Sequence, residues 1–399
     1  MSGGRRVAYE VVRRTFEQGA YADRAFAAEA AGLDPRERRQ AMRLAFGAVQ
    51  RMATSDHAVE QLGGRRPMRL QAELRNALRV SAYELLFSDA VPDRAAVSEG
   101  VELARQVAGG RVAGLANAVL RRIAEAGPAW VEGLPLPLRV SYPEWVIGEW
   151  TALVGEQGAA ACAEAQNRAP ELCVRLNPLR AQARDERELG GRAVEGLPEA
   201  RVLDEGVDLA ATDAFRRGAA WPQSRSSMRP ARLLAPQPGM AVLDLCAAPG
   251  GKAGQLAALM EDRGRLVCVE RHRGRAAELE RTLRRFGMSC AEVVVADVLD
   301  VREERFDRIL LDPPCSGLGV LAGRPDARWR RTPDAAAELA LLQRRMLDHA
   351  RGLLAPGGRL VYSVCTLRRD ECEGVLAGGE YLWPQDVGSD GFYIAVQEG

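Results

Sequence analysis

A regular alternation of short apolar runs and helical segments begins after Pro238-Gly239 and constrains the fold more than any other feature of the chain. Strands that alternate with helices in this way are typical of a parallel, doubly wound sheet. We therefore predict a Rossmann-like α/β domain over residues 236–399. Its five predicted strands are the runs rich in Leu and β-branched residues at 241–245, 266–269, 292–295, 308–311 and 359–362.

Residues 1–127 show a different pattern, because their apolar side chains recur at three- and four-residue intervals. Strand patterns are absent from this region. Asp34 and Pro35 form a good helix start, with Asp34 as the N-cap and Pro35 in the first turn. The helical spacing is interrupted at Gly127-Pro128 and again at 133–137, which indicates a linker. The pattern predicts an all-α domain that ends near residue 127.

Residues 140–235 give a weaker signal than either flanking region. A helix is predicted near 143–153 and a strand at 172–176, and charged, Gly-rich stretches with short apolar pieces follow. We predict a small α+β, RRM-like subdomain here.

Cysteine and histidine usage argues against a metal centre or a disulfide framework. The eight cysteines include no Cys-x-x-Cys pair, and the three histidines lie far apart. No run of about 18 apolar residues is present, and the first residues lack the apolar core of a signal peptide. We expect a cytoplasmic, monomeric protein with neither a membrane nor a metal partner, in which any cysteine that matters acts as a thiol.

The charge distribution says more than the net charge. A net charge of +1 gives no global basic field for a polyanionic partner. Residues 1–135, however, contain 20 arginines against 16 acidic residues, so the first third is mildly basic. Lys252 is the only lysine in the chain. A single lysine among so many arginines indicates a site that accepts a compact ammonium but not a planar guanidinium.

A small-residue loop follows the first strand of the predicted sheet. Ligands of open α/β sheets bind at the carboxyl ends of strands, where small residues let a cofactor approach the backbone. The loop has neither the Gly-x-Gly-x-x-Gly fingerprint nor the spacing of a phosphate-binding Walker loop. By itself it fits a cofactor loop and an ordinary Gly-rich turn equally well. Its residues are Cys246, Ala247, Ala248, Pro249, Gly250, Gly251 and Lys252.

Three further strands each end in an acidic residue: Glu270, Asp297 and Asp312. Singly, each would be a cap or turn residue. Together they describe a pocket for a nucleoside that carries an aliphatic cationic arm, since an acid at such a strand end can hold ribose hydroxyls. S-adenosylmethionine suits this pocket better than a nicotinamide dinucleotide, and we predict it as the cofactor.

Two cysteine motifs follow neighbouring strands. Asp312-Pro313-Pro314-Cys315 comes after the fourth strand and Tyr362-Ser363-Val364-Cys365 after the fifth. Adjacent strand ends lie about 5 Å apart, so both thiols are expected at one edge of the sheet. These motifs resemble those of the RsmB/Sun type of RNA cytosine-C5 methyltransferases, the NOL1/NOP2/Sun family.

The resemblance covers most of the chain. Residues 1–127 resemble the NusB-like RNA-binding domain that precedes the catalytic part in members of the family that act on 16S ribosomal RNA. Gln223–Ser227 and Gly391–Ala395 look like further family segments. The resemblance therefore implies RNA as the partner, with 16S ribosomal RNA as the expected substrate.

The family's chemistry uses both thiols. C5 of cytosine is a poor nucleophile until a thiolate adds to C6. The resemblance implies that Cys365 is that nucleophile and that Cys315 acts in the release step, when the C5 proton leaves. Asp312 is our candidate for the acid near N3. The other meaning of a cysteine is a small buried apolar residue, which we assign to Cys162, Cys173, Cys268, Cys290 and Cys372.

The chain departs from the family pattern at three places, none of which removes a reacting group. Val364 stands where Thr is expected, and Cys372 stands where Asn is expected in a Glu-Asn-Glu run. The stretch between Glu373 and Tyr381 is short, so the far edge of the sheet is expected to be trimmed. Separately, segment 324–331 combines four arginines with Trp329, and we expect it to contact RNA.

Other functions remain open at this point. A transfer RNA substrate is one, because the catalytic domain alone does not identify the RNA. A non-catalytic NusB-like assembly factor is another, although intact Cys315 and Cys365 argue against it. A DNA cytosine-C5 methyltransferase has a different pattern, in which the Pro-Cys cysteine is itself the nucleophile.

Overall fold

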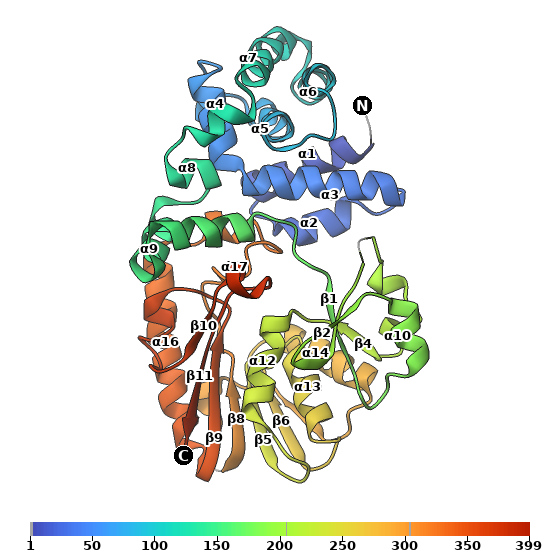
Figure 1. Ribbon diagram of the computed structural model, residues 1–399, viewed down its shortest axis with the longest axis vertical. Coiled ribbons are helices and arrows are strands. Elements are labelled where there is room, and N and C mark those ends of the chain that lie inside the picture. Colours follow the sequence, from blue (N-terminus) through green and yellow to red (C-terminus); the bar gives the residue numbers. More distant parts are fainter. Residues whose placement is uncertain (1–2, 205, 303–304) are drawn as a thin grey trace. The chain divides into compact units, whose positions relative to one another are not determined.

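A computed structural model describes residues 3–204, 206–302 and 305–399 (Figure 1). The chain forms two compact units, Met1–Asn167 with Gly323–Arg330, and Arg168–Ala322 with Arg331–Gly399. Among the described residues, no helix is both long and apolar enough to cross a membrane.

The first unit is helical over its described residues, which confirms the all-α prediction. Its apolar core draws on α1, α3, α5, α6 and α7. Asp34 caps α3 as predicted, because its Oδ1 accepts hydrogen bonds from the backbone N–H groups of Arg36 (2.8 Å) and Glu37 (2.9 Å). The helices are α1 (Gly3–Glu17), α2 (Ala22–Glu29), α3 (Pro35–Gln50), α4 (Met52–Gln61), α5 (Ala72–Phe87), α6 (Asp93–Ala108), α7 (Ala113–Glu132), α8 (Leu136–Val140), α9 (Glu144–Gln166) and α15 (Ala327–Arg330), with short 3-10 turns η1 (Pro67–Arg69) and η2 (Gly110–Val112).

The first unit extends beyond the boundary that the sequence predicts near residue 127. Gly127, with φ of 62°, only kinks α7, which continues to Glu132. Helices α8 and α9 then belong to this unit rather than to the subdomain predicted from residue 140. They are held there by buried side chains, since Tyr142 packs edge-on against Trp150 and the Ser141 hydroxyl accepts a hydrogen bond from Ala53 N at 3.1 Å.

A small antiparallel sheet opens the second unit, with strand order β2-β3-β1-β4. Its central strand β1 (Cys173–Leu176) is the strand predicted at 172–176. This sheet lies in the same compact unit as the large sheet, so the predicted boundary near 236 is not a division between compact units. The remaining elements are β2 (Arg192–Val194), β3 (Leu197–Val202), β4 (Ala220–Pro222), α10 (Ala183–Leu189), η3 (Leu209–Ala211) and α11 (Asp213–Arg216).

A seven-stranded sheet with order β10-β11-β9-β8-β5-β6-β7 forms the rest of the second unit and confirms the Rossmann-like prediction. The five strands from β7 to β9 are parallel, whereas β10 and β11 add antiparallel pairs at one edge. The strands are β5 (Ala241–Leu245), β6 (Arg265–Val269), β7 (Ala291–Val294), β8 (Phe306–Leu311), β9 (Leu354–Val364), β10 (Glu380–Leu382) and β11 (Phe392–Glu398).

Helices cover both faces of this sheet (Figure 1). One face packs on α12 (Arg225–Leu234), α13 (Gly251–Leu259) and α14 (Arg273–Phe286), and the other packs on α16 (Pro333–Gly352). Alternating side chains of β5 divide between the two cores, because Val242 belongs to the first and Leu243 to the second. The remaining short elements are η4 (Val298–Asp300), η5 (Arg369–Glu371) and α17 (Pro384–Val387).

Candidate active site

The two predicted thiols meet at the carboxyl end of neighbouring strands. Cys365 directly follows the last residue of β9, and Cys315 lies in the loop after β8. Their sulfur atoms are 3.3 Å apart, which is hydrogen-bonding distance for two thiols. The adjacency of β8 and β9 in the sheet produces this approach, since the cysteines are 50 residues apart in the sequence.

The environment of the pair distinguishes the two sulfur atoms. The hydrogen bond to Cys365, burial and the negative charge of Cys365 together hold the pKa of Cys315 well above its ordinary value. Cys315 therefore keeps its proton and can donate it in the hydrogen bond to Cys365. In that arrangement Cys365 Sγ is the acceptor of the hydrogen bond.

Lys252 and Asp312 form an ion pair beside the thiols. Lys252 Nζ lies 2.7 Å from Asp312 Oδ2, and Ser363 Oγ lies 3.0 Å from Asp312 Oδ1. Burial alone would lower the pKa of Lys252, but the charge and hydrogen bond of Asp312, with a contribution from Cys365, raise it. Lys252 therefore remains charged beside Asp312 and also interacts electrostatically with Cys365, the candidate nucleophile.

A buried network joins the two cysteine loops. Glu371 Oε1 accepts hydrogen bonds from Ser316 N at 2.8 Å and Gln343 Nε2 at 3.0 Å. Ser316 Oγ lies 2.6 Å from Thr366 Oγ1, so the residues that follow Cys315 and Cys365 bond directly to each other. Burial raises the pKa of Glu371, although its hydrogen bonds oppose that shift. The network fixes the backbone on which each thiol stands.

The departures from the family motif are accommodated in the core. Val364 is fully buried, and Cys372 is fully buried with its Sγ 3.5 Å from Thr366 O. Cys162, Cys173 and Cys268 are also buried, whereas Cys290 is half-buried. The stretch before β10 is short, and its residues 374–378 are turns and bends.

The small-residue loop turns sharply between β5 and α13. Cys246 has φ of 67° and Gly250 has φ of 108°. A Cβ at Gly250 would lie 3.0 Å from side-chain atoms of both Leu279 and Thr282, so only glycine fits there without a shift. Arg275 Nη2 donates a hydrogen bond to Ala248 O at 2.9 Å. The small residues therefore serve the turn itself as well as leaving its backbone accessible.

The predicted acids lie at the carboxyl ends of their strands, where each also has a local partner. Glu270 is buried; its Oε1 accepts a hydrogen bond from His272 N at 2.8 Å, and its Oε2 lies 3.2 Å from Arg275 Nη1. Asp297 Oδ1 accepts one from Leu299 N at 3.0 Å and caps η4. Because a carboxylate has further acceptor sites, these bonds leave capacity for ribose hydroxyls.

Asp244 is a buried acid next to the Lys252–Asp312 pair that the sequence prediction did not include. It lies on β5, is 1% exposed, and neither carboxylate oxygen has a partner among the described residues. Burial, and then the charge of Asp312, raise the pKa of Asp244 to about 8, while Lys252 opposes the shift. An acid inside the apolar run Val242–Leu245 was the available signal. An unpartnered carboxyl group near this strand end fits a cationic ligand.

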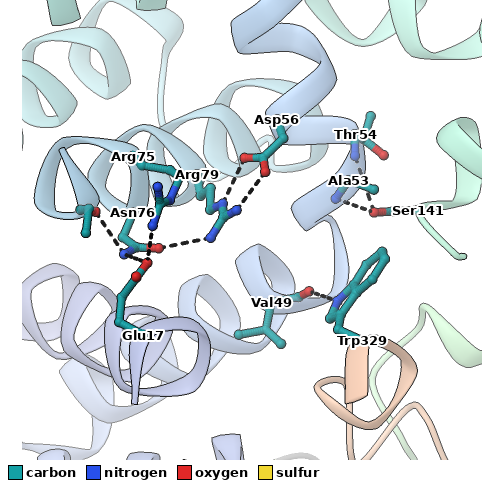
Figure 2. A network of polar contacts seen from close by, with 11 residues as sticks. Glu17, Val49, Ala53, Thr54, Asp56, Arg75, Asn76, Arg79, Ser141 and Trp329 are labelled. Carbon is teal, nitrogen blue, oxygen red and sulfur yellow. Dashed lines mark hydrogen bonds and ion pairs between the residues drawn. The ribbon is translucent and has the colours of Figure 1, made fainter. Parts of the chain in front are cut away.

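The expectation that segment 324–331 contacts RNA is wrong for Arg328, whereas Trp329 is half-buried. Arg328 is fully buried, and Trp329 Nε1 donates a hydrogen bond to Val49 O at 2.7 Å (Figure 2). Both side chains pack within the first unit, whereas Arg324 is exposed. The arginine-rich composition could not distinguish a buried anchor from a solvated surface.

Two protein families match this chain, one in each of its two parts. Residues 231–379 match the 16S rRNA methyltransferase RsmB/F family, and residues 3–125 match the NusB family. A probable ribosomal RNA small subunit methyltransferase B of Synechocystis is 34% identical over 94% of this chain and 88% of its own length. The ribosomal RNA small subunit methyltransferase B of Thermus thermophilus is 36% identical over 86% of this chain and 78% of its own.

A solved structure extends the likeness to the fold. The crystal structure of a methyltransferase homologue from Pyrococcus horikoshii has a TM-score of 0.60 and 28% identity, and the match covers 68% of this chain and 99% of that one.

Proposed function

The chain belongs to the 16S rRNA methyltransferase RsmB/F family, and we propose that it transfers a methyl group to C5 of a cytosine in 16S ribosomal RNA. The observation that carries the choice of atom is the 3.3 Å approach of Cys315 and Cys365. Methylation at C5 needs one sulfur to add to C6 and a base to remove the C5 proton. Methylation of a nitrogen or a ribose oxygen would use neither thiol.

Cys365 starts the reaction in this proposal. Its thiolate adds to C6 of the cytosine, which makes C5 enamine-like and able to attack an electrophilic methyl group. Asp312, held by Lys252 and Ser363, acts near N3, where proton exchange stabilises the adduct. The cytosine must leave any stack to reach the sheet edge, which favours a loop or a single-stranded site.

Cys315 completes the reaction because its protonation changes with the state of Cys365. In the resting pair, the hydrogen bond to Cys365, burial and the charge of Cys365 raise the pKa of Cys315. Once Cys365 is bonded to C6, that hydrogen bond and that charge no longer raise the pKa of Cys315. Burial and the charges of Glu371 and Asp312 still raise it, and Cys315 must lose its proton to water before it acts as the base. The Cys315 thiolate then takes the C5 proton, the electron pair restores the C5–C6 double bond, and Cys365 leaves as a thiolate.

We propose S-adenosylmethionine as the cofactor, held by Cys246–Lys252, Glu270, Asp297 and Asp312. When bound, it supplies the electrophilic methyl group. The remaining acceptor sites of Glu270 and Asp297 suit ribose hydroxyls. The Asp244 carboxyl group has no partner in the cofactor-free protein, and a cationic arm beside it would favour its ionised form. Because Gly250 has no side chain, the backbone of this loop remains accessible to a cofactor.

We assign RNA binding to the first unit, whose residues 3–125 match the NusB family. Its arginine excess supplies phosphate contacts, while the second unit holds the target base. We also propose that the protein is a cytoplasmic monomer that binds RNA with one unit and modifies it with the other.

Bisulfite sequencing of total RNA tests the proposed function, because 5-methylcytosine resists the deamination that converts cytosine to uracil. RNA from cells with and without the gene should differ at one cytosine of 16S ribosomal RNA. Restoring the gene should restore the resistant position, and restoring a Cys365→Ala form should not. A difference confined to transfer RNA would reassign the substrate, and no difference in either RNA would reject the proposal.

A further inference from the structure

We propose that Cys315 and Cys365 form a reversible oxidation site, in which a hydroperoxide converts the two thiols to a disulfide and switches methyl transfer off. The observation that carries this inference is the 3.3 Å distance between the two sulfur atoms, since both thiols are free and half-buried. Formation of the disulfide needs neither RNA nor a cofactor. Its effect on activity rests on the proposed function.

The backbones that carry the two cysteines already lie close enough for a disulfide. Gly319 N, in the Cys315 loop, donates a hydrogen bond to Cys365 O at 3.0 Å. Ser316 Oγ lies 2.6 Å from Thr366 Oγ1. Because disulfide sulfur atoms are about 2.05 Å apart, closure needs a further approach of about 1.3 Å. Rotation of the two side chains about their Cα–Cβ bonds covers that distance, so these hydrogen bonds can remain.

The surroundings give the two sulfur atoms different parts in the oxidation. Lys252 is paired with Asp312 and interacts electrostatically with Cys365. A nearby ammonium favours the thiolate form, which is the form that reacts with a hydroperoxide. The hydrogen bond to Cys365 and burial hold the pKa of Cys315 well above its ordinary value, so Cys315 remains a thiol. We therefore assign the first attack to Cys365.

The oxidation then proceeds in two steps. The Cys365 thiolate attacks the hydroperoxide, the O–O bond breaks, one oxygen stays on sulfur as a sulfenic acid, and the other leaves as an alcohol after taking a proton from water. Cys315 sulfur next attacks Cys365 sulfur, the S–O bond breaks, and the Cys315 proton leaves with the hydroxide as water. Overall, two thiols and one hydroperoxide give one disulfide, one alcohol and one water.

A disulfide would stop catalysis because it occupies both groups that the reaction needs. Cys365 could no longer add to C6, whereas Glu270 and Asp297, at the ends of other strands, would remain available to the cofactor. The disulfide also protects the nucleophile. Without Cys315, the Cys365 sulfenic acid would be oxidised further to a sulfinic acid, which thiol reductants do not reverse.

Cys290 provides a matched control for these variants. Its thiol is also half-buried, but burial and a hydrogen bond to Asp262 raise its pKa to about 12. Such a thiol carries almost no thiolate at neutral pH and reacts slowly with peroxide. Cys290→Ala should therefore leave the oxidation of Cys315 and Cys365 unchanged.

The test treats the full-length protein with hydrogen peroxide and identifies the products by mass spectrometry of its peptides. Wild type and Cys290→Ala should each give peptides joined through Cys315 and Cys365, and dithiothreitol should separate them. Cys315→Ala should instead take up two oxygen atoms on Cys365 that dithiothreitol does not remove. Methylation of 16S RNA should fall in proportion to the joined fraction and return with dithiothreitol, while affinity for S-adenosylmethionine stays the same.

Three results would overturn the inference. They are wild-type protein in which peroxide oxidises Cys365 without joining it to Cys315, a disulfide that forms with another cysteine instead, and a joined form that keeps full methylation activity. If the joined peptides appear as expected but the reduced wild type forms no 5-methylcytosine, the oxidation site stands and the proposed function is rejected.

Discussion

Cys315 Sγ lies 3.3 Å from Cys365 Sγ, and this hydrogen bond, together with burial, holds the pKa of Cys315 well above its ordinary value. The two cysteines therefore place two reactive groups at one edge of the sheet. In the proposed reaction Cys365 is the nucleophile, and Cys315 is the base that acts after Cys365 has bonded to C6.

Lys252→Met should lower kcat by about 100-fold or more, the usual cost of removing a charged group that stabilises the reacting centre. The variant removes the ammonium that lies 2.7 Å from Asp312 and interacts electrostatically with Cys365. Lys252→Arg is the matched control: it keeps the charge and should retain part of the activity, since a planar guanidinium does not match the compact ion. Single-turnover methylation of 16S RNA measures both. Full activity in Lys252→Met would show that the ion pair is not part of the chemistry.

Cofactor binding should depend on the acids at the strand ends. We expect calorimetry to give a dissociation constant in the micromolar range for S-adenosylmethionine, of the order of ordinary substrate affinities. Glu270→Ala and Asp297→Ala should each weaken it about tenfold, as the loss of a hydrogen bond to a charged group does. Asp300→Ala, at an exposed acid on the same short turn as Asp297, is the control. Equal affinity in all three variants would remove these acids from the site.

Asp244 should make the stability of the cofactor-free protein depend on pH. Unfolded aspartate releases its proton near pH 3.9, whereas in the folded protein burial raises the pKa of Asp244 to about 8. Between these pH values the folded state binds more protons, so stability falls as pH rises, by at most about 1.4 kcal/mol per pH unit. Asp244→Asn should flatten this dependence and unfold at higher urea at about pH 8, while exposed Asp386→Asn should not. Parallel pH profiles for wild type and Asp244→Asn would mean that Asp244 is ionised in the folded state.

RNA affinity should depend on exposed arginines of the first unit. Arg36, Arg39 and Arg43 are exposed on α3 at helical spacing. Replacing all three with Gln should weaken 16S RNA binding and make its salt dependence shallower, because each phosphate contact releases counterions. The same change at Arg273, Arg281 and Arg284, exposed on α14, is the charge-matched control.

These substitutions are a cleaner test than deletion of residues 1–127. That deletion would also remove Val49 and Gly19, to which Trp329 and Arg330 bond, and so would disrupt what remains of the first unit. Identical affinity and salt slope in the α3 variant and the wild type would place the RNA contacts elsewhere.

Local patterns predicted much of the fold. The five parallel strands and the Asp34 cap depend on residues close together in the sequence, and both are confirmed. The extent of the first unit depends instead on long-range packing, such as Arg328 against Tyr142, which no local spacing reveals. Long-range packing also explains why the arginines of segment 324–331 did not indicate a buried anchor.

The candidate site, like the fold, was predictable where it depends on local sequence patterns. Strand-end position placed Asp312, Cys315 and Cys365 at one edge, and the uniqueness of Lys252 indicated a special environment. The importance of Glu371 was not predictable, because it acts through hydrogen bonds to Ser316 and Gln343 from other parts of the chain. Asp244 was not predicted as part of the site, because it lies within the apolar run Val242–Leu245, which is typical of a buried strand.

The most direct test of the account is the fate of labelled 16S RNA mixed with S-adenosylmethionine and either Cys315→Ala or Cys365→Ala, followed by denaturing gel electrophoresis. Cys365→Ala should bind both ligands and form neither product nor adduct, since nothing adds to C6. Cys315→Ala should add and transfer but fail to remove the C5 proton, so a covalent protein–RNA band should accumulate. An adduct in Cys365→Ala with none in Cys315→Ala would reverse the two roles, and the absence of both adduct and methylation in the wild type and both variants would contradict the mechanism entirely.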